Sequence, residues 1–246
     1  TLANGDFTIG SETILTQINA AQLRSVTGIL TITMNNALVT TNFNLLETVG
    51  SHFIDQNIAL ATIDYPSLKT NNGSLTITNN TALTTISFAS LETITDNFTL
   101  SNNNSLVTPG IFNTLTTIGD TFTVHSNLLL ENINATYFSN VTTMPNLDVS
   151  GNPSLQQIKF DKVTTMTSIV IEYNSALSAN DSLSFSTLSD VTSLLTISNN
   201  SNYTFADGLV VFPLFGVPIT VEDGILIINN FDNNSNQHIR RAKNLV

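Results

Sequence analysis

The sequence predicts an all-β protein, a right-handed parallel β-solenoid of about ten coils of 22–26 residues. Three observations predict this fold. One template of apolar positions recurs along the chain, each repeat opens with a short apolar–polar alternation, and an asparagine follows the alternation at a fixed spacing. A period of this length is typical of solenoids, in which each coil buries its apolar side against its neighbours.

The best-formed repeat runs from Gly73 to Ile94 and reads GSLTITNNTALTTISFASLETI. Counted from Leu75, its apolar residues lie at 0, +2, +8, +11, +13, +16 and +19, with asparagine at +5. The template places coil starts at Phe7, Leu30, His52, Leu75, Phe98, Phe122, Leu147, Ile169, Leu195 and Leu226. The last interval is 31 residues long, so we expect one domain over residues 1–231, with a variant coil or cap near 205–231. Residues 232–246 are expected to form a polar tail or linker.

The first four residues of each coil, such as LTIT and FTLS, predict half-buried strands that pair in parallel from coil to coil. The rest of each coil is rich in Thr, Ser and Asn and predicts extended segments and turns instead of a helix. Glycine precedes the strand by two residues in several coils, where we expect a bend with positive φ. These glycines are Gly5, Gly28, Gly50, Gly73 and Gly224.

Position +5 is asparagine in eight coils. Stacked from coil to coil, these amides are expected to form an internal ladder that satisfies backbone groups at the bend, with asparagine itself tolerating the left-handed conformation. The ladder residues are Asn35, Asn57, Asn80, Asn103, Asn127, Asn152, Asn174 and Asn200.

The combined pattern L-x-I-x-x-N-x-x-L-x-x-I, continued by F-x-x-L-x-x-I, resembles leucine-rich repeats and more closely the receptor L-domain type. That type includes fungal GPI-anchored cell-wall proteins and microbial surface leucine-rich repeat proteins. The resemblance implies an extracellular setting and a non-catalytic role. Animal receptor L-domains contain cysteines and this chain has none, which favours a microbial surface protein.

The charge and the apolar stretches of the sequence limit the kinds of partner that we expect for this chain. Seven basic residues against 18 acidic ones give a net charge of −11, which argues against nucleic acid and anionic membrane. The longest apolar stretch, residues 208–221, is broken by Pro213 and Pro218 and is too short to span a bilayer. The chain begins at Thr1 without a methionine or a signal sequence, which predicts a processed form or a fragment.

The outward +1 and +3 positions of the strands are the candidate binding surface. Thr76, Thr99 and Thr123 belong to a threonine column that resembles ice-binding solenoids, although such a face should be uninterrupted. His125, Asp148 and Glu172 form a polar cluster on adjacent coils, and such a cluster can carry acid–base chemistry or simply be solvated. His52 replaces an apolar residue at position 0 and is expected to be partly buried with a backbone partner.

Ten N-x-S/T sequons occur, about the number that this composition gives by chance. The candidate N-glycosylation sites are Asn72, Asn97, Asn134, Asn140, Asn180 and Asn202.

Together these features predict a non-enzymatic extracellular or cell-surface protein that uses a rigid repeat surface for adhesion, wall assembly or self-association. We expect no cofactor and no metal. The expected partner is a protein or carbohydrate at a cell surface, or a second copy of the chain. Two alternatives stay open, a carbohydrate-active β-solenoid enzyme and an ice-binding protein.

Overall fold

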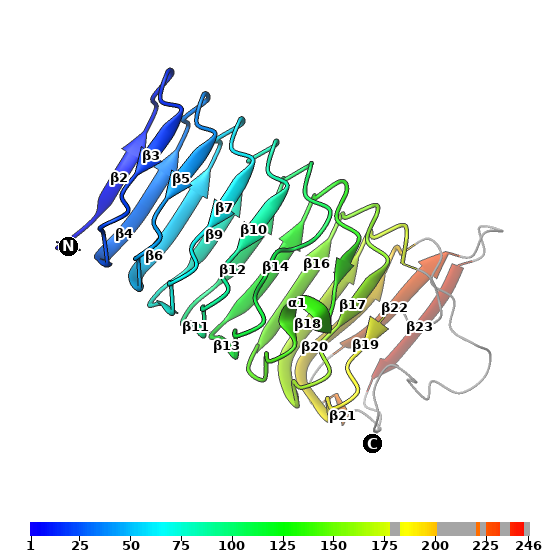
Figure 1. Cartoon of the computed structure of the whole chain (residues 1–246). Helices are drawn as coiled ribbons and strands as arrows, with labels where there is room; N and C mark the ends of the chain where they lie inside the picture. Colours follow the sequence, from blue (N-terminus) through cyan, green and yellow to red (C-terminus); the bar gives the residue numbers. More distant parts are fainter. Residues whose placement is uncertain (178–182, 201–219, 222–224, 232–236, 244–246) are drawn as a thin grey trace.

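The computed structural model describes residues 1–177, 183–200, 220–221, 225–231 and 237–243. It is nearly all β, with 44% strand and 2% helix, and its parallel strands stack into a β-solenoid of about 8 turns. The rod extends from the N-terminal coil to the C-terminal strands (Figure 1). The predicted fold class is therefore confirmed. The template's ten coils slightly exceed the turns observed, although all ten coil starts lie in strands of one sheet.

This main sheet takes one strand from each coil, and neighbouring strands pair in parallel. Its strands are, in spatial order, β2 (Phe7–Gly10), β4 (Ser25–Thr33), β6 (Thr48–Asp55), β9 (Leu75–Thr78), β12 (Phe98–Ser101), β14 (Thr121–His125), β16 (Asn146–Ser150), β18 (Thr165–Glu172), β20 (Asp190–Ser198) and β22 (Ile225–Phe231). Two short strands pair at its ends, β1 (Leu2–Ala3) with β4 and β21 (Thr220–Val221) with β20. Strand β23 (Gln237–Lys243) pairs antiparallel with β22, within the segment expected to be a polar tail.

Short strands form the other sides of the coils. One side carries β3 (Gln17–Asn19) with β5 (Thr40–Asn42), β7 (Thr62–Asp64) with β10 (Thr85–Ser87), and β15 (Asn132–Ile133), β17 (Gln157–Lys159) and β19 (Leu183–Ser184). The stretch leading into the main sheet carries β8 (Thr70–Asn71), β11 (Thr93–Ile94) and β13 (Thr117–Ile118). Within the described residues, the single helix is the four-residue α1 (Ala135–Phe138).

Each template position stacks on the same position of the next coil. Phe98 pairs in register with Leu75 on one side and with Phe122 on the other. Because register is preserved, the apolar positions of all coils meet in one continuous core, where Leu75 and Ile77 are fully buried.

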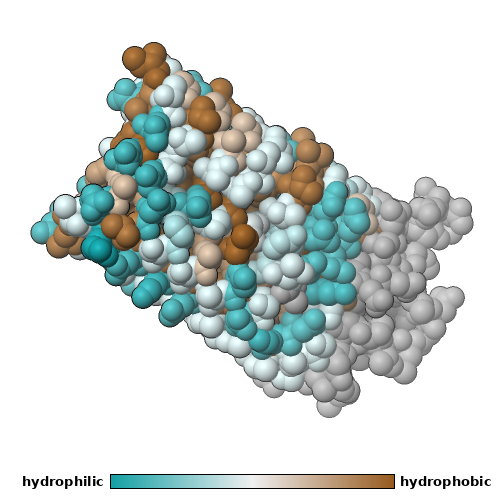
Figure 2. Space-filling model, in the orientation of Figure 1, coloured by the Kyte–Doolittle hydropathy of each residue, from teal (hydrophilic) through white to brown (hydrophobic). Residues whose placement is uncertain are grey.

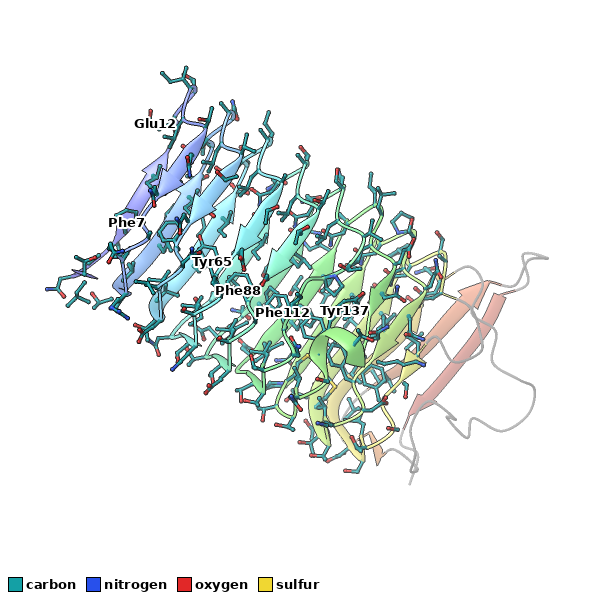
Figure 3. The ribbon with its side chains drawn as sticks, in the orientation of Figure 1. Phe7, Glu12, Tyr65, Phe88, Phe112 and Tyr137 are labelled. Atoms are coloured by element: carbon teal, nitrogen blue, oxygen red, sulfur yellow. The ribbon has the colours of Figure 1, made fainter. Side chains whose placement is uncertain are left out.

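A column of aromatic rings runs through this core at and near position +13. Neighbouring ring centroids lie 5.3 to 6.3 Å apart. The column consists of Phe43, Tyr65, Phe88, Phe112, Phe138, Phe160 and Phe185. Figure 3 shows Tyr65, Phe88 and Phe112 following one another along the rod. Stacked aromatic pairs add about 0.5–1.5 kcal/mol each beyond their burial, so the column stabilises the contact between coils.

His52 lies against this column and corrects the expectation of a partly buried side chain. It is fully buried, its ring lies 4.6 Å from the Tyr65 ring, and neither ring nitrogen has a hydrogen-bond partner among the described residues. Burial lowers the pKa of His52 to about 3. The imidazole is therefore held neutral inside an apolar core.

The tight bend after each main-sheet strand is made by the residue at +4, not by the asparagine at +5. Eight non-glycine residues at +4 have φ between 54° and 61°, and Gly151 has φ 65°. The eight are Ser11, Met34, Gln56, Asn79, Asn102, Ser126, Tyr173 and Asn199.

The glycines before the strands also have a different role from the one expected. Gly5 has positive φ, but Gly28, Gly50 and Gly73 do not, and Gly224 lies outside the described residues. A Cβ at Gly50 would lie 2.4 Å from the Gly28 carbonyl oxygen. Glycine is required there because the backbones of adjacent coils approach closely.

No helix in the described part of the chain is long and apolar enough to cross a membrane.

Candidate functional site on the outer sheet face

A ladder of buried asparagines runs along the turns that follow the strands of the main sheet. The backbone N–H of Asn80 donates to Oδ1 of Asn103 at 3.1 Å, and Asn103 repeats this bond to Asn127 at 3.0 Å. The Nδ2 group of Asn103 donates to the carbonyls of Ile77 and Ser101, at 2.9 and 3.0 Å. All eight predicted ladder residues are fully buried, and they form an unbroken chain of backbone-to-amide bonds from Asn35 to Asn200.

The +1 and +3 side chains of each strand point outward and form two columns that run along the rod. Thr76, Thr99 and Thr123 are consecutive members of the +1 column and are half-buried. Phe53 precedes them and Asp148 follows them in the same column. The threonine array is therefore three residues long between interruptions, which disfavours an ice-binding face.

The structure brings His125, Asp148 and Glu172 onto one part of this face. Strand β16 places Asp148 in the +1 column and Ser150 in the +3 column, and Ser150 pairs with His125 on one side and Glu172 on the other. His125 and Glu172 are thus two strands apart, about 10 Å. Asp148 lies diagonally between them.

The environment of Asp148 gives its carboxyl a pKa above the ordinary value. Burial raises the pKa of the Asp148 carboxyl, and the neighbouring Glu172 charge acts in the same direction. A hydrogen bond from Ser150 and the proximity of His125 oppose the rise without cancelling it. The Glu172 carboxylate accepts a hydrogen bond from Ser198 on the next strand, and His125 Nδ1 lies 3.3 Å from the Ser126 hydroxyl.

A second polar position on the outer face, Asp55, was not singled out as a site by sequence. It is 6% exposed, and its Oδ1 atom accepts bonds from Thr78 at 2.6 Å and from Asn79 at 2.8 Å. Gln56 donates to Oδ2 at 2.9 Å. The half-exposed ring of Phe53 lies two residues away on the same strand. The signal for this position was present, since both residues depart from the Thr-rich pattern of neighbouring coils.

The sequons differ in accessibility. Asn72 is exposed, and its side chain makes no hydrogen bond with the described residues. Asn97 accepts a bond from the Thr121 N–H, and Asn134 caps α1 while donating to Gln157. Asn140 donates to the Asn113 carbonyl and accepts from Lys162. Asn180 and Asn202 lie outside the described residues.

No group of three or more His, Cys, Asp or Glu side chains with metal-binding geometry occurs in the ranges that the structure describes. No protein-family model, curated protein or solved structure matches the chain.

Proposed function

We propose that this chain is a non-enzymatic extracellular or cell-surface protein of the leucine-rich-repeat type, which binds a protein or carbohydrate, or another copy of itself, through the outer face of its main sheet. The observation that carries the proposal is the in-register array of outward hydroxyl and carboxyl groups. These groups lie on a sheet that is held by the buried core side chains and the asparagine ladder. Binding surfaces of solenoids are commonly extended faces of this kind.

Rigidity supports a binding role. Every strand of the face from β4 to β20 is followed by a ladder asparagine, and the core side chains at 0 and +2 in these coils are buried. The side chains on the face therefore lose little backbone freedom when a partner binds. Preorganisation of this kind improves affinity because less entropy remains to be lost.

The polar cluster gives this face its distinct chemistry. Asp148, Glu172 and the hydroxyl of Ser150 provide acceptors and a donor over two neighbouring strands, and His125 adds a ring nitrogen. Sugar hydroxyls and peptide amides both donate to carboxylates. The cluster is therefore the part of the face where we expect the partner to be recognised.

The test is a binding screen of the full chain against immobilised polysaccharides, cell-wall preparations and the protein itself. We expect the Asp148→Asn and Glu172→Gln double variant to weaken binding at least tenfold, since hydrogen bonds to charged groups contribute about 1.5–3 kcal/mol each. Asp64→Asn with Glu92→Gln removes the same charges from other sides of the coil and serves as the control. Equal binding by both variants would exclude the cluster.

A second candidate is polysaccharide cleavage. The observation that favours it is the carboxyl pair itself, because Asp148 has a raised pKa and Glu172 lies diagonally across the next strand. Pairs of this kind divide the roles of acid and base in glycoside hydrolysis. Turnover of a polysaccharide that stops in Asp148→Asn, with binding retained, would establish this candidate. Absence of turnover over a broad panel would remove it.

A further inference from the structure

A shallow pocket of about 310 Å³ opens on the edge of the rod where the chain enters strands β16, β18 and β20. Threonines dominate its lining, and six of them contribute: Thr142, Thr143, Thr164, Thr165, Thr167 and Thr192. Pro145 and the edges of two methionines complete it. The volume is at the lower end of the range for small-molecule sites, about 300–1,000 Å³.

The backbone explains why a hollow forms here. In the first coils the position two residues before the strand is glycine, and adjacent backbones pack against each other. The same position holds Pro145 and Thr167 in the later coils, and the Pro145 carbonyl accepts bonds from the N–H groups of Thr167 and Ser168. A bulge follows, in which Thr192 and Ser193 lie opposite the single residue Thr167. Bulges redirect side chains and are frequent near functional sites.

The hydroxyls of the pocket are free to bind a ligand. All six threonines are exposed. Only Thr142 uses its hydroxyl within the described residues, in a long 3.4 Å bond to the Thr116 carbonyl. A threonine hydroxyl both donates and accepts, and its methyl group offers an apolar contact beside it.

This lining matches one class of ligand. No charged side chain lines the pocket among the residues that the structure describes, and Asp190 lies opposite Thr165 in the register of β18 and β20. An anionic ligand would find no cation among the described lining residues. A neutral sugar presents hydroxyls that donate and accept, and C–H faces that pack against methyl groups and a proline ring. We propose that this threonine pocket is a binding subsite for a neutral saccharide, separate from the acidic cluster on the outer sheet face.

The test is titration of the full chain, followed by calorimetry, with four hexasaccharide probes: cellohexaose, laminarihexaose and mannohexaose, which are neutral, and hexagalacturonate, which is anionic. We expect at least one neutral probe to bind and hexagalacturonate to bind more weakly. Thr143→Val with Thr165→Val should reduce the affinity for the neutral probe about tenfold or more, because two hydroxyl bonds are lost. Valine keeps the shape and strand preference of threonine, and circular dichroism checks the fold.

Two comparison variants make the result decisive. Thr40→Val with Thr62→Val removes two exposed hydroxyls from β5 and β7 and should leave affinity unchanged. Asp148→Asn with Glu172→Gln, titrated with the same probe, separates the pocket from the outer-face cluster, because binding that is lost in this variant and kept in the pocket variant belongs to the outer face. The inference is overturned if no neutral probe binds, if the pocket variant binds as tightly as the parent, or if only the outer-face variant loses binding.

Discussion

At the scale of single residues, the core contains two kinds of buried polar side chain with opposite consequences. The ladder asparagines are fully paired, each bonding to the coils on both sides. His52 is equally buried, yet neither of its ring nitrogens is paired among the described residues. A buried unpaired polar group costs about 1–3 kcal/mol. The asparagine ladder therefore stabilises the rod, whereas the unpaired imidazole of His52 destabilises it.

We predict that His52→Leu makes the protein more stable, and increasingly so in acid. The folded-state pKa of about 3 lies below the unfolded value of 6.5, so the unfolded chain binds more protons between these values. The free energy of unfolding of the parent protein has its full value above pH 6.5 and falls as the pH decreases toward 3. The variant should gain about 1–2 kcal/mol at pH 7 and about 2 kcal/mol more at pH 5.

Urea unfolding at several pH values, compared between parent and variant, measures this difference. His125→Leu on the outer face is the matched control, and should not reproduce the gain. An identical pH slope for the parent and His52→Leu would contradict the role of this imidazole.

Asn103→Ala should have the opposite effect and destabilise the protein by about 3–5 kcal/mol. The change leaves the Asn80 N–H and the carbonyls of Ile77 and Ser101 without their amide partners in a buried turn. Asn36→Ala, at an exposed position one residue after a ladder asparagine, is the control and should change stability by less than about 0.5 kcal/mol. The denaturant midpoints of the two variants measure this difference in stability. Equal midpoints would contradict the stabilising role of the ladder.

At the scale of elements, the distance between neighbouring backbones decides which residue types fit at the position two residues before each coil start. At Gly28, Gly50 and Gly73, an added Cβ would lie less than 3 Å from an atom of the preceding coil, so only glycine fits. Further along the rod, Pro145 and Thr167 occupy the same position, and the threonine pocket lies there. The apolar side chains left exposed gather toward the N-terminal end and the upper edge of the view in Figure 2. The residue at this position thus changes along the rod, while the apolar pattern of the core stays the same.

The substitution Gly50→Ala tests the close approach of the backbones of adjacent coils. The added methyl would meet the carbonyl oxygens of Gly28 and Thr27 at 2.4 and 2.7 Å, both of them backbone atoms. We expect a loss of about 1–3 kcal/mol, the usual range for overpacking, measured as a lowered Tm. Asp96→Ala is the control because it lies at the equivalent position and already carries a Cβ. A Tm for Gly50→Ala within a degree or so of the parent, where 1 kcal/mol is worth about 2–4 °C, would show that the coils can separate without cost.

At the scale of the whole molecule, each coil contacts mainly its neighbours, so a complete coil is the unit of construction. Deleting residues 75–97 joins Ser74 to Phe98 and preserves every column, because Phe98 already stacks in register on Leu75. We predict that this variant folds, with a denaturant m-value reduced by about one-eighth, in proportion to the surface lost. Deleting residues 75–91 instead breaks the register and should give an unfolded or aggregated product. Similar far-ultraviolet spectra for the two deletions would contradict this modular picture.

The sequence predicted the columns that depend on residue type and spacing alone. Leu75, Ile77 and Asn80 recur at fixed offsets, and parallel stacking in register follows from them. The conformation at +4 was missed because Met34, Gln56 and Tyr173 share no chemistry that favours positive φ.

The candidate site was predictable only in part. Which outward residues share a column follows from the repeat, so the neighbourhood of His125, Asp148 and Glu172 was accessible from sequence. The insertion of Ser150 between two of them in the +3 column required the strand register. The threonine pocket was not accessible, because it arises from a bulge between coils of unequal length.

The asparagine ladder also gives the rod a direction. From Asn35 to Asn174, the backbone N–H of each ladder asparagine donates to the amide oxygen of the ladder asparagine in the following coil. The side-chain dipoles of successive coils are therefore aligned, and hydrogen bonds in such a chain polarise one another. Because these dipoles are aligned, the two ends of the rod differ in electrostatic potential. Any coil added to the stack can continue this alignment only if it is joined head to tail.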